Sequence, residues 1–501
     1  MKIFKFIMFL FLTGGIITSC SDSDDVEDFP VEKPDNTLTA EEELELEIKD
    51  FVWKAMNNIY LYKSDVPDLA DNRFSSQTEL KEYLLKWDSP EDLFYDGLLY
   101  DYPEKDRFSW IVDDYVELEN MFQATGKSAG FKYGFAYAPN SNSQVLAYVT
   151  YVSPGGPADD SGLERGDYIS EVNGSTITVN NYQGIFGNDV LELGLSTIQD
   201  GVVVPEENPI TVTKASFKEE TVPVSKVFTE GGVKIGYLYL STFLGEFGID
   251  DTKLNNVFGE FKAQNVQELI VDLRYNSGGY SEFSADLASM VTGQFEGEIF
   301  TQQKWNENYQ AYFEQEAPER LYNRFDSKID DGAAINSLNL NRVYVIATGR
   351  SYSASESFII GLEPYIDVVH VGSDTGGKFQ GSVTLYDSEN FSKTGANPDH
   401  KYALQPLVYK FANANGYTDF IDGLTPDVLI EESPSNLGQL GELDEPLLAE
   451  TIAQITGNRS QSPGDFERWE SGKLQPEDER GFYISSKNIF DELPQKKPLF
   501  K

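Results

Sequence analysis

The sequence is poor in the side chains that most often bind metals or act as nucleophiles. It contains one cysteine and two histidines in 501 residues. A single thiol excludes an intramolecular disulfide and a zinc site made of thiolates, and two histidines exclude a histidine-rich metal centre. The sequence also lacks a phosphate-binding GxxxxGKS/T loop and a GxGxxG turn after a strand. We therefore expect neither a metal nor a cofactor.

Basic residues are scarce as well. The 39 lysines and arginines stand against 83 aspartates and glutamates, which gives a formal net charge of −44. This charge would repel the phosphate backbone of nucleic acids, so we expect no nucleic-acid partner. Apolar residues make up 40% of the chain, which is enough for several cores. The length favours about three domains.

The first 20 residues have the order of features found in a secretory signal. Lys2 and Lys5 precede an apolar run at residues 6–12, which is too short for a comfortable membrane span, and Cys20 follows. This pattern resembles a bacterial lipoprotein signal, in which the segment equivalent to residues 1–19 is removed and the cysteine is acylated. The resemblance implies a lipid anchor at Cys20 in the outer membrane of the cell envelope. The alternative is an ordinary signal peptide with an incidental cysteine.

Polar segments bound the part of the chain that we expect to fold. Residues 20–36 are acidic and proline-bearing, which is typical of a flexible tether. The acidic run at residues 21–25 resembles the surface-export tag of some Gram-negative lipoproteins and implies exposure at the cell surface. Residues 457–501 form a polar, proline-bearing tail.

Residues 37–125 favour helices. Thr39 and Glu42 have the spacing of a capping box, and apolar residues from Leu44 to Ile59 recur at helical intervals. This predicts a helix of about six turns. Further helices are expected at residues 77–87 and 89–95. We interpret the acidic residues on the other face of the first helix as solvated.

Residues 126–225 are rich in short β runs, with strands expected at residues 131–137 and 144–152. The block SPGGPA at residues 153–158, followed by GLERGDYI at residues 162–169 and EVNG after it, resembles a PDZ domain of the bacterial protease type. The resemblance implies that this domain binds an extended peptide as an added strand and holds its terminal carboxylate. The alternative is another β domain with the same turn.

Residues 226–456 contain four continuous apolar runs separated by helical stretches. The runs lie at residues 235–240, 268–273, 342–347 and 366–371. Such runs are typical of buried strands in an α/β layer fold. We expect this domain to carry the chemistry.

Ser353 follows the third of these predicted strands and precedes an apolar helical stretch. At such a junction the serine hydroxyl would lie beside the amide of Ala354 at a helix N-terminus. That placement suits a nucleophile with an oxyanion donor next to it. The alternative is a capping box, because Ser353 and Glu356 have the required spacing.

Lys378 lies 25 positions after Ser353, in a glycine-rich stretch just after the fourth predicted strand. One helix and one strand fit between the two residues, so the lysine can return to the same edge of the sheet. Burial would lower the pKa of its amine, and only the neutral amine can act as a general base. The alternative is a surface lysine in a glycine turn.

Four segments in one order resemble the C-terminal processing, or tail-specific, serine peptidases. They are DLRYNSGG at residues 272–279, SASE at 353–356, TGGK at 375–378 and GLTPD at 423–427. The resemblance implies a multidomain α+β protein with a helical N-terminal domain, a PDZ-like β domain and an α/β crotonase-like catalytic domain. It also implies Ser353 as the nucleophile, Lys378 as the base, and an oxyanion hole formed by Ala354 with Gly278 or Gly279.

The sequence also departs from that family. Many members have a glutamine four residues after the lysine, whereas this position is Ser382 here and the nearest glutamine is Gln380. These two residues are our candidates for orienting Lys378. Gly376 stands where the family usually has phenylalanine. We interpret Asp272 and Arg274 as a buried ion-paired scaffold.

The resulting hypothesis is a serine endopeptidase that hydrolyses extended or unfolded polypeptides, bound in part through their C-termini. His370 lies in an apolar run and is interpreted as a core residue, while His400 lies in a polar stretch. The alternative is a catalytically inert lipoprotein of the same fold that acts as a peptide- or ligand-binding scaffold.

Overall fold

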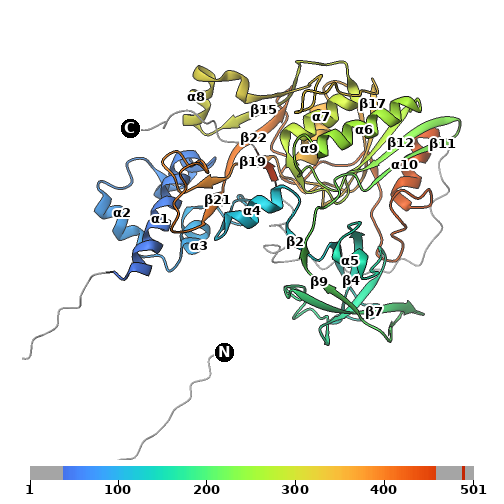
Figure 1. The fold of residues 1–501 in the computed structure, drawn as a ribbon, viewed down its shortest axis with the longest axis horizontal. Coiled ribbons are helices and arrows are strands. Elements are labelled where there is room, and N and C mark those ends of the chain that lie inside the picture. The colour runs from blue at the N-terminus through green and yellow to red at the C-terminus, as the bar shows by residue number, and fades with distance from the viewer. Residues whose placement is uncertain (1–37, 458–487, 491–501) are drawn as a thin grey trace, which may run out of the picture. The chain divides into compact units, whose positions relative to one another are not determined.

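A computed structural model describes residues 38–457 and 488–490 (Figure 1). The chain divides into two units, Met1–Glu43 and Leu44–Lys501. The expected signal, the lipidated Cys20 and the acidic tether lie outside the described residues. No helix in the described ranges is both long and apolar enough to cross a membrane.

The helices expected near the N-terminus are present. Helix α1 spans Ala40–Ile59, and the Thr39–Glu42 capping box forms as predicted, with the Thr39 amide donating to Glu42 Oε2 at 2.7 Å. The following elements are α2 (Gln77–Leu84), α3 (Pro90–Asp92), the π-helix η3 (Leu93–Leu98) and α4 (Tyr115–Phe122), with short 3₁₀ turns η1 (Lys63–Asp65) and η2 (Pro67–Leu69) between α1 and α2.

A seven-stranded antiparallel sheet with its own core follows. The neighbours run β3-β4-β5-β7-β8, with β6 on β5 and β9 on β7. The bounds are β3 Phe131–Tyr137, β4 Val145–Val152, β5 Tyr168–Val172, β6 Ser175–Thr176, β7 Val190–Gln199, β8 Val202–Pro205 and β9 Ile210–Thr213, with α5 at Pro157–Asp160. The first two strands were expected from the sequence. Strands β2 (Lys127–Ser128) and β10 (Ala215–Ser216) pair with each other at the start and end of this region.

A six-stranded sheet in the order β11-β12-β13-β17-β18-β23 carries the four buried strands predicted from the sequence. Apart from the antiparallel pair β11–β12, its neighbours are parallel. The bounds are β11 Val224–Glu230, β12 Val233–Tyr239, β13 Glu268–Asp272, β17 Arg342–Ala347, β18 Asp367–Gly372 and β23 Val428–Leu429. Because parallel strands end at the same edge, the segments after β13, β17 and β18 meet there.

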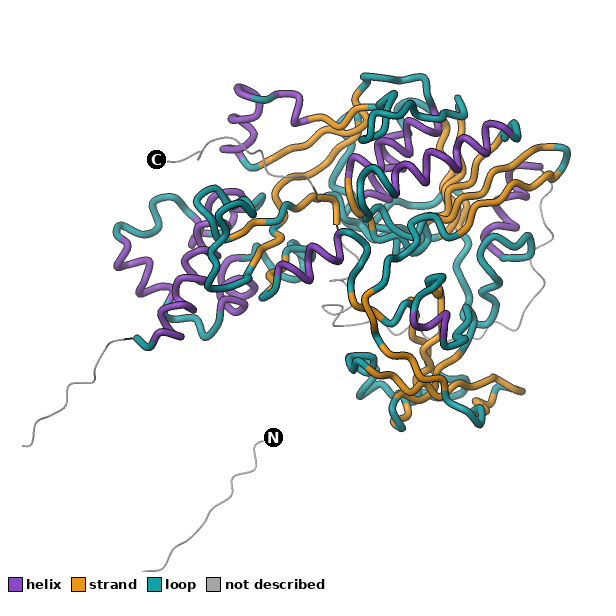
Figure 2. Tube along the Cα trace, viewed as in Figure 1, coloured by secondary structure: helices purple, strands orange, loops and turns teal. Residues whose placement is uncertain are grey.

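Both faces of this sheet are covered. Alternate side chains point to opposite faces of a strand, so Leu238 of β12 enters the core that includes helices α6 (Asp250–Ala263), α7 (Ser281–Thr292) and α9 (Ala354–Leu362). Tyr237 enters a second core with Leu447 and Leu448 of α10 (Pro446–Thr456). Figure 2 shows the purple helices lying against the orange strands.

A second six-stranded sheet has the order β14-β24-β19-β22-β15-β16. Its bounds are β14 Gly278–Tyr280, β15 Ile299–Trp305, β16 Tyr322–Arg324, β19 Gln380–Ser382, β22 Leu407–Asn413 and β24 Asn488–Phe490, with α8 (Glu307–Glu316) and η4 (Pro318–Leu321) between β15 and β16. Strand β24 comes from the tail, where no strand was expected.

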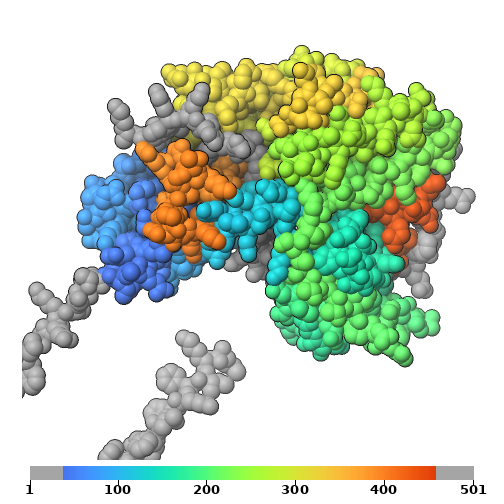
Figure 3. Space-filling model, in the orientation of Figure 1, coloured from blue at the N-terminus to red at the C-terminus, as the bar shows by residue number. Residues whose placement is uncertain are grey.

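The helical N-terminal region shares one core with the region of the mainly parallel six-stranded sheet. Side chains of α1, such as Phe51 and Val52, belong to the same buried cluster as Leu238 and Phe358. Strand β1 (Trp110–Val112) also pairs with β21 (Ala403–Gln405), which pairs with β20 (Leu385–Tyr386). In Figure 3 this orange part of the chain lies on the blue N-terminal helices.

Candidate active site

Ser353 lies where the sequence predicted it, between β17 and α9, as the N-cap residue of the helix. Its backbone has φ 60° and ψ −110°. A non-glycine residue in such a conformation costs on the order of 1–3 kcal/mol, so the surroundings must hold it. The preceding turn is anchored to the end of β13, because Ser351 Oγ donates to the Leu273 carbonyl at 2.7 Å and the Tyr352 amide donates to the Asn276 carbonyl at 3.2 Å.

The Ser353 side chain is buried, and its hydroxyl is not engaged in a hydrogen bond with any residue in the described ranges. The spacing of a capping box is present, and the Glu356 carboxylate accepts the Ser353 amide at 2.7 Å. The hydroxyl itself approaches the helix end without a cap hydrogen bond of ordinary geometry. Both side chains therefore take the positions of a capping box, but only the Glu356 contact is a hydrogen bond of ordinary geometry.

The Glu356 carboxylate joins the serine segment to the lysine segment. Its Oε2 accepts the amides of Ser353 at 2.7 Å and of Lys378 at 2.9 Å. Its Oε1 accepts the Thr375 hydroxyl at 2.6 Å and the Gly377 amide at 2.7 Å. Sequence reasoning identified Glu356 only as a helix cap and missed this link.

Glu356 is fully buried, and burial raises its pKa to about 7 against the opposing effect of these four hydrogen bonds. The ionised form is the one that can accept all four, because a protonated carboxyl would need one oxygen to donate. The carboxylate thus fixes the backbone on both sides of the site.

Lys378 follows β18 and is also fully buried. Burial lowers the pKa of its amine from 10.5 to about 7, although the charges of Asp106 and Glu356 act in the opposite direction. Its Nζ lies 5.3 Å from the centre of the Phe108 ring. At neutral pH a large fraction of the amine is therefore unprotonated, as a general base requires.

The segment 106–109 of the helical region builds the surroundings of the lysine, and sequence reasoning missed it. Asp106 is buried and accepts hydrogen bonds from the Tyr60 and Ser109 hydroxyls, both at 2.6 Å. Arg107 Nη2 donates to the carbonyls of Gly376 at 3.2 Å and of residue 377 at 3.0 Å. No periodic or motif signal marks this short segment in the sequence.

Gly376 replaces the expected phenylalanine for a visible reason. A Cβ placed on Gly376 would lie 1.8 Å from Cε1 of Tyr352. The Tyr352 ring therefore fills the space that a side chain at position 376 would need.

The two glycines predicted for the oxyanion hole lie next to the serine. Gly278 has φ 106°, and a Cβ on it would lie 2.9 Å from the Ser353 Cβ and 3.0 Å from the Ala354 amide nitrogen. Only glycine fits this approach. The Gly278 amide donates to Asn276 Oδ1 at 2.9 Å, which makes Gly279 the better candidate for an oxyanion donor beside Ala354.

The two candidates for orienting the lysine are buried nearby but do not pair with it here. Gln380 Nε2 donates to the Tyr62 hydroxyl at 2.9 Å. Gln380 Oε1 and Ser382 Oγ have no hydrogen-bond partner among the described residues. Their predicted role therefore stays a prediction.

Both histidines make their hydrogen bonds elsewhere. His370 Nε2 lies 3.3 Å from the Ala347 carbonyl, and burial lowers the pKa of this side chain. His400 Nε2 lies 3.0 Å from Asp387 Oδ2. The described ranges also contain no group of three or more His, Cys, Asp or Glu residues placed to hold a metal ion.

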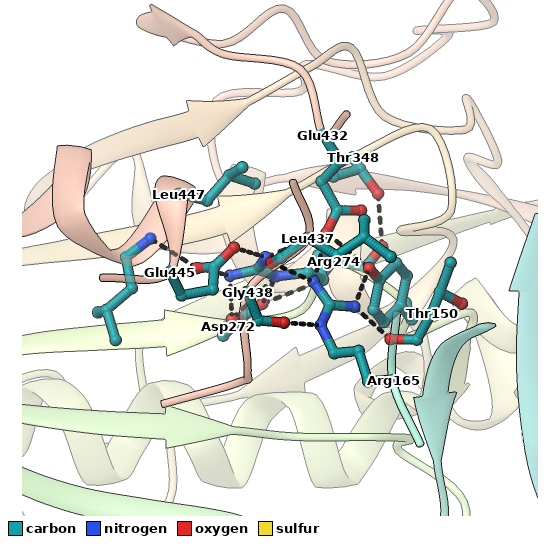
Figure 4. Close-up of polar contacts among 12 residues, drawn as sticks. Thr150, Arg165, Asp272, Arg274, Thr348, Glu432, Leu437, Gly438, Glu445 and Leu447 are labelled. Carbon is teal, nitrogen blue, oxygen red and sulfur yellow. Dashed lines mark hydrogen bonds and ion pairs between the residues drawn. The ribbon is translucent and has the colours of Figure 1, made fainter. Parts of the chain in front are cut away.

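Asp272 and Arg274 form a buried scaffold under the site, as expected (Figure 4). Arg274 pairs with Asp272 at 2.7 Å and with Glu445 at 2.5 Å. Arg274 also contacts Glu432 at 3.1 Å. Glu432 in turn pairs at 2.9 Å with Arg165, which lies in the turn before β5 of the antiparallel sheet. Burial raises the pKa of Glu432, but the charges of Arg274 and Arg165 outweigh it and leave this pKa at about 2.

Three family models match the chain. Residues 234–430 match Peptidase family S41, residues 47–110 match the Peptidase S41 N-terminal domain, and residues 148–189 match the PDZ domain. A comparison with curated proteins finds no match.

Solved structures with a similar fold include a protein of Bacteroides fragilis NCTC 9343 classed with the S41 proteases. It is 23% identical with a TM-score of 0.62, over 82% of this chain and 98% of that one. The photosystem II D1 C-terminal processing protease is 18% identical with a TM-score of 0.47, over 83% and 99% of the two chains. Mature CPAF complexed with lactacystin is 12% identical with a TM-score of 0.42, over 83% and 97%.

Proposed function

The chain belongs to peptidase family S41, and from this premise we propose that it is a serine endopeptidase with Ser353 as nucleophile and Lys378 as general base. The observation that carries the proposal is the Glu356 carboxylate, which holds the amides of both residues on one oxygen. The buried amine and the unbonded hydroxyl supply the required chemistry.

In the first step the neutral Lys378 amine takes the proton of Ser353 as Oγ attacks the carbonyl carbon of the scissile bond. The oxyanion that forms is stabilised by the amides of Ala354 and Gly279. The lysine then gives its proton to the leaving amine, and an acyl-enzyme remains on Ser353. In the second step the lysine takes a proton from water as the water oxygen attacks the ester carbonyl. The lysine then returns this proton to Ser353 Oγ as the ester C–O bond breaks, which releases the carboxylic acid product and regenerates both side chains.

The substrates that this arrangement favours are extended or unfolded polypeptides. The match of residues 148–189 to the PDZ domain supports binding of free peptide C-termini by the antiparallel sheet. We further propose that acylated Cys20 anchors the protein in the outer membrane, because two or more acyl chains give stable membrane binding. A Cys20→Ala variant that still fractionates with membranes would argue against this anchor.

Fluorophosphonate labelling followed by mass-spectrometric site mapping tests the catalytic assignment. We expect the label on Ser353, with hydrolysis of unfolded casein lost in Ser353→Ala. Ser357→Ala, a buried serine of the same helix, is the matched control and should stay active. A folded protein that neither labels nor hydrolyses casein would favour the inert scaffold of the same fold.

A further inference from the structure

Strand β24 lies between two strands that both adjoin the candidate active site. The sheet order is β14-β24-β19. Strand β14 begins at Gly278, beside Ser353, and β19 begins at Gln380, two residues after Lys378. In Figure 1, β24 is the short red arrow next to β19. A segment of the tail thus occupies the space between the nucleophile side and the base side of the site.

The outer edges of β14 and β19 are already occupied. On β14, the Tyr280 amide donates to the Phe243 carbonyl at 3.0 Å, and the Phe243 amide donates to the Gly278 carbonyl at 2.8 Å. On β19, the other neighbour is β22. The two inner edges therefore face each other across a slot one strand wide, since neighbouring strands lie about 4.8 Å apart.

The register places the tail next to the reacting groups. Asn488 pairs with Gly278, Ile489 with Gly279 and Phe490 with Tyr280, all in parallel. Phe490 also pairs with Ser382 of β19, again in parallel. The backbone at position 488 therefore lies opposite the glycine that contacts Ser353.

We propose that this slot binds an extended polypeptide by adding it as a strand, and that residues Asn488–Phe490 of the chain itself occupy it in the resting protein. The tail then competes with substrate for the same backbone hydrogen bonds. The location of the slot follows from the strand pairing. The effect of the tail on hydrolysis rests on the proposed peptidase function. Backbone pairing of this kind accepts many sequences, because main-chain groups supply the affinity.

The connection to the rest of the chain makes the competition effective. About 30 residues separate Gly457 from Asn488, enough to span on the order of 100 Å when extended. A ligand tethered within the same chain has an effective concentration of about a millimolar, depending on the length of the connection. Residues Asn488–Phe490 can thus occupy the slot even if they bind it weakly, until a polypeptide substrate displaces them.

Ile489→Pro in the full-length chain tests this inference, because proline cannot donate to a ladder in the middle of a sheet. We expect the variant to hydrolyse unfolded casein with a KM several-fold lower and an unchanged kcat. Fluorophosphonate labelling of Ser353 should also be several-fold faster. Gln495→Pro, in the same tail but outside β24, is the control and should behave as the unaltered protein. Intact mass confirms beforehand that each protein retains its tail.

A fluorescent peptide with the sequence of residues 484–494 tests the slot without any chemistry. It should bind the Ile489→Pro protein, measured by anisotropy, and bind the unaltered protein at least several-fold more weakly, while the same peptide with proline at the positions of Ile489 and Phe490 binds neither, because it lacks main-chain donors. Equal peptide affinity for both proteins, or no affinity for either, overturns the inference. If peptide binding follows the expectation but Ser353 never labels, the slot stands and the proposed catalytic function fails.

Discussion

Ser353 and Lys378 donate their backbone N–H groups to the same oxygen, Oε2 of Glu356, at 2.7 and 2.9 Å. The proposed nucleophile and the proposed base come from two loops that follow neighbouring parallel strands, β17 and β18. The buried carboxylate holds these loops together at the sheet edge. The geometry of the pair therefore depends on a residue that takes no part in the bond-making steps.

Glu356→Gln should weaken both the fold and the catalysis. The new NH₂ group would face backbone amides that also donate, so we expect a loss of about 1–3 kcal/mol in the free energy of unfolding and a lower kcat. The negative charge of Glu356 raises the pKa of Lys378. Its removal should therefore shift the acidic limb of the activity profile to lower pH.

That shift separates a positioning role from simple destabilisation. Urea unfolding and the pH profile of casein hydrolysis measure the two effects. Glu363→Gln, at the exposed residue that follows the same helix, should leave the pH profile unchanged. An unshifted profile in a folded Glu356→Gln protein contradicts the assignment.

Lys378→Met should abolish activity and change how stability depends on pH. Between pH about 7 and 10.5 the unfolded chain carries the Lys378 proton while the folded chain does not. The free energy of unfolding of the unaltered protein should therefore rise with pH in this window, by up to about 1.4 kcal/mol per unit. Glu356 has the opposite effect below this window. Because its pKa is raised in the folded protein, it lowers the free energy of unfolding as pH rises from 4.5 to about 7.

Denaturation at several pH values checks the expectation. The Lys378→Met protein should lose this part of the slope, whereas Lys393→Met, at an exposed lysine paired with Glu119, should retain it. Identical slopes in all three proteins would show that Lys378 is protonated in the folded state.

Ser353→Ala should remove activity with little loss of stability. A serine that capped the helix would cost about 1 kcal/mol on replacement by alanine, but the Ser353 hydroxyl makes no hydrogen bond in the described structure. Ser353→Gly should be more stable than Ser353→Ala, because glycine adopts the positive φ without strain. Thermal unfolding of the three proteins gives the comparison. A Ser353→Ala protein that stays active would mean that Ser353 only caps the helix and is not the nucleophile.

The antiparallel sheet should discriminate between free and amidated peptide C-termini. A carboxylate held on backbone amides is lost when the terminus is amidated, so the amide form should bind at least several-fold more weakly. Fluorescence anisotropy with two peptides of identical sequence measures this. Equal affinities would mean that the domain binds internal segments or serves as structure.

The parts of the site that the sequence predicted are those with a local pattern. The apolar runs and the glycine-flanked motifs located the strands, Ser353 and Lys378, because each depends on neighbours in the chain. The surroundings of Lys378 depend instead on Asp106 and Phe108, far away in sequence and without periodic signal. Strand β24 was missed because it shows only a two-residue apolar run, Ile489 and Phe490, without a periodic pattern that would predict a strand.

The central claim is that neutral Lys378 activates Ser353, and the rate of fluorophosphonate labelling at Ser353 between pH 5 and 10 tests it most directly. We predict a rate that rises with pH through a single ionisation near 7, because protonation below this pKa removes the base. Lys378→Ala and Lys378→Arg should lose this rise, since a guanidinium keeps its proton, while His370→Gln and His400→Gln should keep it. A folded Lys378→Ala protein that labels at nearly the unaltered rate, or a folded histidine variant that does not label, would contradict the account.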